Sequence, residues 1–128
     1  MARKPSTTLT EAELRLMAVL WERGPSTVGE ITAALPPPPI AYNSVLTTMR
    51  ILEQKGYVEH EEQGRAFVYR VIVQRDDAAK SAVGHVLSRF FDNSASSLAL
   101  RLIENERPSS DELRRLRALI EQYEEGAK

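Results

Sequence analysis

Residues 41–70, AYNSVLTTMRILEQKGYVEHEEQGRAFVYR, place a helix directly before a hairpin, and this succession constrains the fold more than any other feature. The segment from about Asn43 to Lys55 repeats apolar residues at helical spacing, and Gly56 is suited to end that helix. The runs YVEHEE and AFVYRVIV that follow are rich in β-branched and aromatic residues, with the turn residues QG between them. We therefore expect a helix and then two antiparallel strands joined by a tight turn.

Two shorter helices are predicted before this stretch because each opens with a capping box. Thr10 with Glu13 opens the first, and Thr27 with Glu30 opens the second. The proline run at residues 36–39 ends the second helix, and we interpret it as a rigid connector rather than a ligand for a proline-binding module. Three helices followed by a hairpin is the order of a winged helix-turn-helix, whose third helix enters the major groove of DNA.

The third helix has two faces when its residues are placed 100° apart around the axis. Val45, Met49 and Leu52 share one face and are expected in the core. The polar residues on or beside the opposite face are the predicted DNA contacts, namely Asn43, Ser44, Thr47, Thr48 and Arg50. Asparagine and arginine suit adenine and guanine edges, and threonine suits a base or a phosphate. An ordinary solvated face is the alternative, and the position in a winged-helix order favours DNA.

The hairpin supplies one further predicted DNA contact. Arg65 follows the turn glycine at the hairpin tip, where a cation suits a backbone phosphate. Glu59, Glu61 and Glu62 lie on the approaching strand and would repel DNA if they faced it.

The aromatic residues of the hairpin are expected to pack on the helices. Phe67 and Tyr69 share one face of the second strand, and Tyr57 begins the first. We favour this packing over a stacking surface for single-stranded nucleic acid.

The charge balance argues against a nucleic-acid binder. The chain carries 17 Lys and Arg against 18 Asp and Glu, for a net charge of −1. DNA affinity depends on neutralised phosphates, so a basic domain would favour DNA more strongly. Arg3 and Lys4 are expected to reach the DNA backbone as a loose arm. This balance keeps a second function open, a winged-helix protein–protein interaction module without sequence-specific DNA binding.

Several kinds of chemistry are excluded by composition. The chain has no cysteine, which removes disulfides, cysteine-ligated zinc and thiolate catalysis. His60 and His85 are the only histidines and lie on different predicted elements, so we expect no metal site, and we expect no cofactor. No phosphate loop or nucleophile motif supports an enzyme. No apolar span is long enough for a bilayer and no apolar stretch follows the N-terminal basic residues, so we expect a cytoplasmic protein without membrane insertion.

Residues 75–128 predict a separate helical lobe, which leaves residues 1–74 as the winged-helix domain of a mostly α protein. A helix from residue 75 is interrupted by DNSAS, SLALRLIENE forms a second, and Ser109 with Glu112 opens the last through a third capping box. Three short helices with this much apolar surface are expected to pack against a second copy. The residues predicted to form that dimer are Val86, Phe90, Leu113, Leu116, Ile120 and Tyr123.

The chain resembles the penicillinase-repressor family (BlaI/MecI, with the related copper repressors) over nearly its whole length. The matching stretches are LTEAELRLMAVLWERGPSTVGEI, AYNSVLTTMRILEQKGYV, GRAFVYR and SSLALRLIENERPSSDELRRLRALIE. The resemblance implies a winged helix-turn-helix, a helical dimerisation lobe, and a homodimer that represses transcription from a palindromic operator in double-stranded DNA. It also implies a membrane sensor-protease, encoded nearby, as a partner.

Three departures from the family pattern bear on regulation and operator choice. Proteolytically controlled members carry an Asn–Phe pair where this chain has Arg101 and Leu102, which argues against induction by cleavage there unless the protease has other preferences. The copper-sensing members carry a cysteine-rich hook, which this chain lacks, so copper sensing of that kind is excluded. Asn43 stands where the family often has threonine, a difference that bears on the operator sequence.

Overall fold

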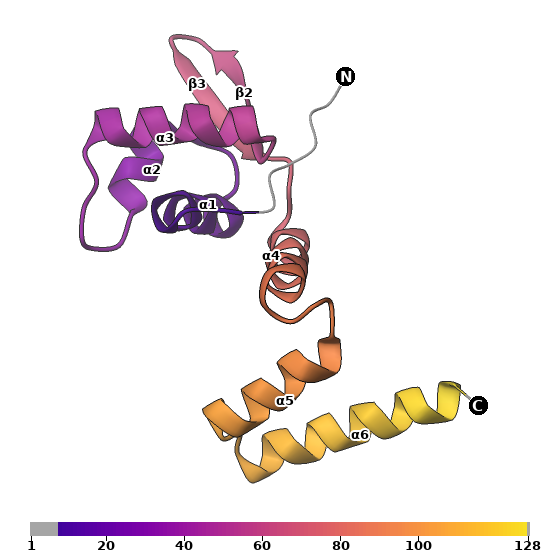
Figure 1. The fold of residues 1–128 in the computed structure, drawn as a ribbon. Coiled ribbons are helices and arrows are strands. Elements are labelled where there is room, and N and C mark those ends of the chain that lie inside the picture. The colour runs from indigo at the N-terminus through magenta and orange to yellow at the C-terminus, as the bar shows by residue number, and fades with distance from the viewer. Residues whose placement is uncertain (1–7, 128) are drawn as a thin grey trace. The chain divides into compact units, whose positions relative to one another are not determined.

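The computed structural model describes residues 8–127, so the arm expected at Arg3 and Lys4 lies outside the described residues. The chain is mostly helical (Figure 1). The elements, in chain order, are α1 (Glu11–Arg23), β1 (Ser26–Thr27), α2 (Val28–Ala34), α3 (Tyr42–Lys55), β2 (Val58–Gln63), β3 (Ala66–Val71), α4 (Arg75–Phe90), α5 (Ala95–Glu106) and α6 (Ser110–Gly126). The predicted three helices, hairpin and three further helices are all present.

The described chain forms two compact units that divide between His85 and Val86. This division falls inside α4, whereas the division expected before residue 75 coincides with the start of that helix. The first unit holds the winged helix, and the second holds the end of α4 with α5 and α6.

The sheet of the winged helix has three antiparallel strands in the order β1-β3-β2. The hairpin pairs β2 with β3 along its whole length, with His60 opposite Tyr69. The short strand β1 adds Ser26 opposite Tyr69 and Thr27 opposite Val68 on the other edge of β3. The sequence did not predict β1, because two residues between two helices carry no alternating pattern. Its pairing fixes the entry of α2 against the hairpin.

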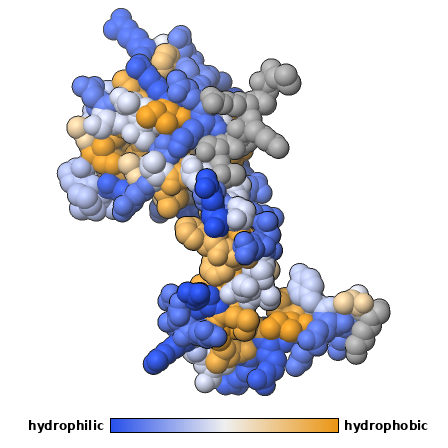
Figure 2. Space-filling model, viewed as in Figure 1, coloured by the Kyte–Doolittle hydropathy of each residue, from blue (hydrophilic) through white to orange (hydrophobic). Residues whose placement is uncertain are grey.

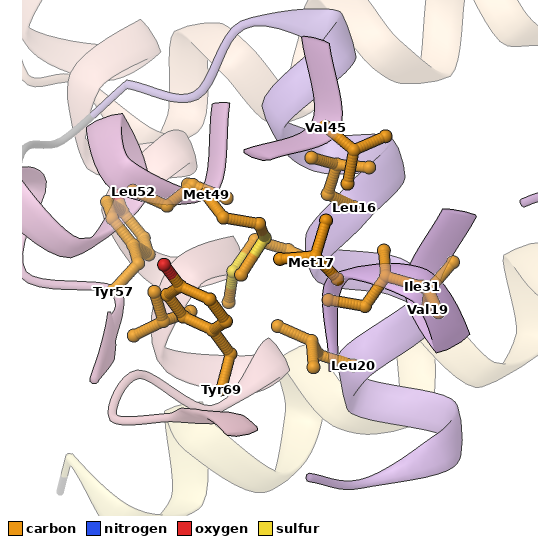
Figure 3. Packing of buried hydrophobic residues seen from close by; sticks show 12 residues of the cluster. Leu16, Met17, Val19, Leu20, Ile31, Val45, Met49, Leu52, Tyr57 and Tyr69 are labelled. Carbon is orange, nitrogen blue, oxygen red and sulfur yellow. The ribbon is translucent and has the colours of Figure 1, made fainter. Parts of the chain in front are cut away.

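A continuous hydrophobic core holds the winged helix together (Figure 3). It draws on the first three helices and on the hairpin. Its members include Leu16, Met17 and Leu20 from α1, Ile31 from α2, Val45, Met49 and Leu52 from α3, and Tyr57 and Tyr69 from the hairpin region. Val45, Met49 and Leu52 are each 0% exposed, which confirms the core face predicted for the third helix. Burying that face leaves the opposite side of α3 in solvent.

Helix ends follow the local signals of the sequence, with one exception. The boxes predicted at Thr10, Thr27 and Ser109 all form, so α1, α2 and α6 begin with reciprocal side-chain and backbone hydrogen bonds. Helix α3 instead begins after Ala41 with no side-chain cap. It ends at Gly56, whose φ of 92° lies in the left-handed region that favours glycine.

The proline run is tied to the first helix. One Nη of Arg15 donates to the carbonyl oxygen of Pro36 at 2.7 Å and also to that of Pro38. Residues 36–39 form no helix or strand, and they link α2 to α3. These contacts support the interpretation of the run as a connector.

As far as residue 127, the second unit has no buried side chain of its own. None of the residues of α4, α5 or α6 is buried, although each helix carries large apolar residues. Figure 2 shows hydrophobic surface over this part of the chain. In the described part of the chain, no helix is both long enough and apolar enough to span a bilayer.

Candidate nucleic-acid interface

The predicted DNA contacts of the third helix share the solvent side of α3. Asn43, Ser44, Thr47 and Arg50 are exposed, while Thr48 is half-buried at the edge of the same surface. Their positions follow from the burial of the opposite face in the core. This arrangement presents an amide, hydroxyl groups and a guanidinium on one helix.

The two threonine hydroxyls are already engaged within α3. The Oγ1 of Thr47 donates to the carbonyl oxygen of Asn43 at 3.0 Å, and the Oγ1 of Thr48 donates to that of Ser44 at 2.8 Å. A phosphate oxygen can only accept a hydrogen bond, so each hydroxyl would have to leave its helix partner to donate to one. As they stand, the threonines offer a methyl group and an acceptor oxygen, which suit thymine methyls and base amino groups.

The start of α3 has no side-chain cap, so its first backbone N–H groups are available to an anionic ligand. The first N–H groups of a helix lack partners within the helix and carry partial positive charge. Capping side chains occupy such groups in α1, α2 and α6, and none does so at Ala41. This end of α3 is therefore suited to a phosphate.

Arg50 and Arg65 meet at one hollow between α3 and the hairpin. The hollow has a volume of about 440 Å³. It is lined by Thr27, Val28, Gly29, Tyr42, Leu46, Arg50, Arg65, Ala66 and Phe67. Within the described part of the chain, neither arginine makes a hydrogen bond or an ion pair. Two arginines from separate elements, neither with an ion-pair partner among the described residues, therefore border one open site.

Tyr42 and Phe67 were not among the predicted contacts, although both line this hollow. Tyr42 is 53% exposed at the first position of α3, and its spacing of eight residues from Arg50 places it on the same side of the helix. That spacing was the available signal. Phe67 was expected to pack on the helices but remains 38% exposed, whereas Tyr57 and Tyr69 are buried as predicted. Phe67 instead stacks on His60, with ring centroids 4.4 Å apart.

The pleat of the hairpin turns two of its three glutamates away from α3. Side chains alternate between faces along a strand, and His60 faces the core side opposite buried Tyr69. Glu59 and Glu61 therefore point to the other face, where Glu59 pairs with Arg70 at 2.7 Å. Only Glu62 shares the His60 face and is exposed there. The repulsion expected from this strand is smaller than its sequence indicates.

An ion pair and a side-chain hydrogen bond link α3 to the rest of the unit. Lys55 at its end lies 2.7 Å from Glu13 in the first turn of α1. Burial raises the pKa of Glu13, but hydrogen bonds from Lys55 and the Thr10 backbone outweigh it and hold the pKa below its ordinary value. Glu53, two residues earlier, accepts from Nδ1 of His60 at 2.7 and 2.8 Å.

The model of the penicillinase repressor family matches residues 9–122 of this sequence. The chain belongs to the penicillinase repressor family. This family consists of transcriptional repressors and not of enzymes, so the chain is a transcriptional repressor and the expectation that it is not an enzyme is confirmed. The resemblance expected from the four matching stretches is also confirmed.

Curated relatives align along almost the whole repressor. The penicillinase repressor of Bacillus licheniformis is 27% identical over 116 residues, covering 90% of this chain and 91% of that protein. The methicillin resistance regulatory protein MecI of Staphylococcus aureus is 20% identical over 113 residues, covering 88% and 92%. A solved structure of reduced AbfR bound to DNA has a TM-score of 0.49 at 20% identity, covering 76% of this chain and 75% of that one.

The remaining predicted sites of this repressor lie in its second unit and are accessible. The predicted dimerisation residues are exposed by 37% for Val86, 78% for Phe90, 42% for Leu113, 38% for Leu116, 55% for Ile120 and 73% for Tyr123. Arg101 and Leu102, in the region compared with the cleavage site of other members, are exposed on α5. Among the described residues, no cluster of His, Asp or Glu could hold a metal ion.

Proposed function

We propose that this repressor binds a palindromic operator as a homodimer, with α3 of each copy in the major groove and each hairpin on the adjacent backbone. The observation that carries this proposal is that Arg50 and Arg65 border one open site between α3 and the hairpin, where neither is paired with any residue that the structure describes. A cation on the helix and another at the hairpin tip match the two surfaces that a winged helix offers to a groove and its flanking strand.

Each α3 residue has a role that its chemistry supports. Asn43 and Arg50 suit base edges, and Thr47 suits a thymine methyl or a base amino group. Ser44 and the uncapped amides at the start of α3 suit a phosphate, as does Arg65 on the hairpin. Thr48 is the weakest of the proposed contacts, because its hydroxyl is bonded within the helix and it is half-buried.

Dimerisation is proposed through the apolar faces of the second unit. Leu113, Leu116 and Ile120 line one hollow with Ile103 of α5, and none of these side chains is buried within the chain. Paired winged helices would read half-sites about one helical turn apart. A dimer also compensates for the weak attraction expected from a chain with a net charge of −1.

The net charge also supports the second candidate, a winged-helix module that binds protein and not specific DNA. Selection from random duplex DNA with the purified full-length chain separates the two. Recovery of a palindrome with half-sites about one turn apart supports the repressor dimer bound as proposed. Recovery of no sequence at low salt, from protein shown to be dimeric, favours the interaction module.

Two arginine variants test the assigned roles on the recovered duplex. Arg50→Ala should cost about 1–3 kcal/mol of binding and relax the preference at one base pair. Arg65→Ala should weaken binding to all duplexes alike and reduce the dependence on salt. Unchanged affinity and preference in the first variant, or a loss confined to one base position in the second, would contradict the assignment.

A further inference from the structure

Glu53 follows Arg50 by three residues on α3, a spacing at which opposite charges on a helix normally attract each other. The two side chains are not paired here. Both carboxylate oxygens of Glu53 lie within hydrogen-bond distance of Nδ1 of His60 on β2, at 2.7 and 2.8 Å. Arg50, in contrast, makes no hydrogen bond or ion pair with any described residue.

The position of the Glu53 carboxylate decides how much positive charge Arg50 can offer to DNA. A carboxylate paired with Arg50 would neutralise a guanidinium that lines the hollow beside Arg65. It would also place negative charge next to phosphates, and like charges across an interface weaken association. Arg50 can therefore bind DNA fully only if another group holds the Glu53 carboxylate away from it.

His60 is held in place to receive Glu53. Its ring stacks on Phe67 with centroids 4.4 Å apart, and on Tyr69 with centroids 5.4 Å apart. A carboxylate can only accept hydrogen bonds, so Nδ1 carries a proton and donates it whichever charge the ring has. The N–H group that binds Glu53 thus belongs to an imidazole ring that the aromatic side chains of the hairpin hold in place.

Glu53 and Arg50 lie three residues apart, so their side chains project from adjacent turns of α3. Burial raises the pKa of Tyr69, the charge of Glu53 raises it further, and the charge of Arg50 lowers it. The two charges therefore act on one phenol from adjacent turns of α3. We expect that, without a competing donor, Glu53 would pair with Arg50, as opposite charges three residues apart on a helix can.

We propose that His60 is a positioning residue of the DNA-binding face, which holds the Glu53 carboxylate against the hairpin and so leaves Arg50 free to bind DNA. This inference rests on the proposed function, because it assigns Arg50 to the DNA contact. It explains why an acidic residue can stand one turn from a DNA-contacting arginine without cancelling it.

The test uses the full-length chain and the duplex recovered by selection. His60→Phe keeps an aromatic ring on Phe67 and removes the donor, and should weaken binding roughly two- to tenfold. The double variant His60→Phe with Glu53→Gln should bind within about twofold of the wild type, because a neutral amide cannot neutralise Arg50. Circular dichroism and thermal unfolding show that each variant is folded.

A purely structural role for the pair gives the opposite pattern. If His60 and Glu53 only fasten the hairpin to α3, Glu53→Gln alone weakens binding and the double variant does not recover, which overturns the inference. In an Arg50→Ala background, His60→Phe should have no further effect. A further loss there would show that His60 acts through another group, and would also overturn it.

A measurement without DNA keeps this inference separate from the proposed function. A crystal structure of His60→Phe should show the Glu53 carboxylate within about 4 Å of the Arg50 guanidinium. A carboxylate that stays away from Arg50 overturns the inference even if the repressor binds its operator. Re-pairing in a protein that selects no DNA would instead support the positioning role and refute the DNA contact.

Discussion

The winged-helix unit and the second unit carry equally clear helical patterns, yet only the first encloses a core. In the first, twelve hydrophobic residues are buried, none with more than 6% of its surface exposed. In the second, neither the end of α4 nor α5 or α6 has a buried residue. The capping signals do not differ in the same way, because α6 opens with the same reciprocal box as α1 and α2. Local helix signals therefore do not distinguish a unit that is complete alone from one that needs a partner.

The two units differ in whether the apolar faces of their helices are covered by other residues of the same chain. Met49 of α3 is 0% exposed in a core shared with α1 and the hairpin region, so the apolar face of α3 is covered within one chain. Leu116 and Ile120 of α6 line an open hollow and remain 38% and 55% exposed. An apolar face of this kind is stable in water only when another surface covers it. Changes made in one unit at a time should therefore have different effects on folding and on association.

The largest effect is expected from separating the units. A fragment ending at His85 should fold cooperatively at any protein concentration, because its core is complete. A fragment beginning at Val86 should be unfolded when dilute and gain helix only as concentration rises. Circular dichroism over a concentration series measures both. A second fragment that is helical and monomeric when dilute would refute the contrast.

Association should be lost when charge is placed on the α6 face. Leu116→Asp and Ile120→Asp should each yield monomers, since an unpaired carboxylate would be buried in the dimer. Gln122→Asp, at an exposed polar position of the same helix, is the matched control and should leave the assembly intact. Sedimentation velocity reports the mass of each variant. An intact Leu116→Asp dimer would place the interface elsewhere, for example on α4.

A smaller effect, confined to stability, is expected in the core of the first unit. Leu52→Ala should lower the free energy of unfolding by about 2–5 kcal/mol, because the side chain is 0% exposed and leaves a cavity. Leu14→Ala, at a position of α1 that is 49% exposed, should change it by about 0.5 kcal/mol or less. Urea unfolding compares the two, and similar losses would mean that the core is not where the structure places it.

The smallest effect is expected from Glu13 and depends on pH. The pKa of Glu13 is lowered in the folded chain, so its contribution is present above the ordinary value of 4.5 and is lost as pH falls through the lower folded value. Glu13→Gln should therefore cost about 1–3 kcal/mol at neutral pH and progressively less below pH 4.5. Glu11→Gln, on the exposed first turn, is the control. A pH-independent difference for Glu13→Gln would exclude the ion pair as its cause.

The fold was predictable wherever a signal is local. Capping boxes, a terminal glycine and helical spacing involve residues within one or two turns, and these signals gave the helices, the hairpin and the buried face of Val45, Met49 and Leu52. Because the apolar face of α3 could be assigned to the core, the opposite face could be assigned to solvent. Arg50 and Arg65 were each predicted, but their meeting at one hollow was not, since it depends on how the hairpin packs.

The remaining features are contacts between residues of different elements, and no periodic pattern in the sequence indicates such contacts. Lys55 reaches Glu13 across 42 positions, and the indole of Trp21 donates to the Val73 carbonyl across 52. The pair of Glu53 with His60 is closer in sequence, yet it crosses from a helix to a strand. Strand β1 forms because β3 offers a free edge beside it. Such contacts are set by tertiary packing, which a single sequence does not encode as a pattern.

Helix α4 crosses the division between the units as one uninterrupted element. In the proposed homodimer, α4 therefore connects each winged helix to the dimerisation unit. Two DNA-binding units that are weak alone then act as one bivalent ligand. When one DNA-binding unit is bound, the other faces its half-site at a high effective concentration, and such linkage raises apparent affinity by about 10²–10⁴. Any break in the chain beyond the winged helix would remove that gain while leaving every DNA-facing residue in place. Occupancy of the operator could thus be switched off by chain connectivity alone.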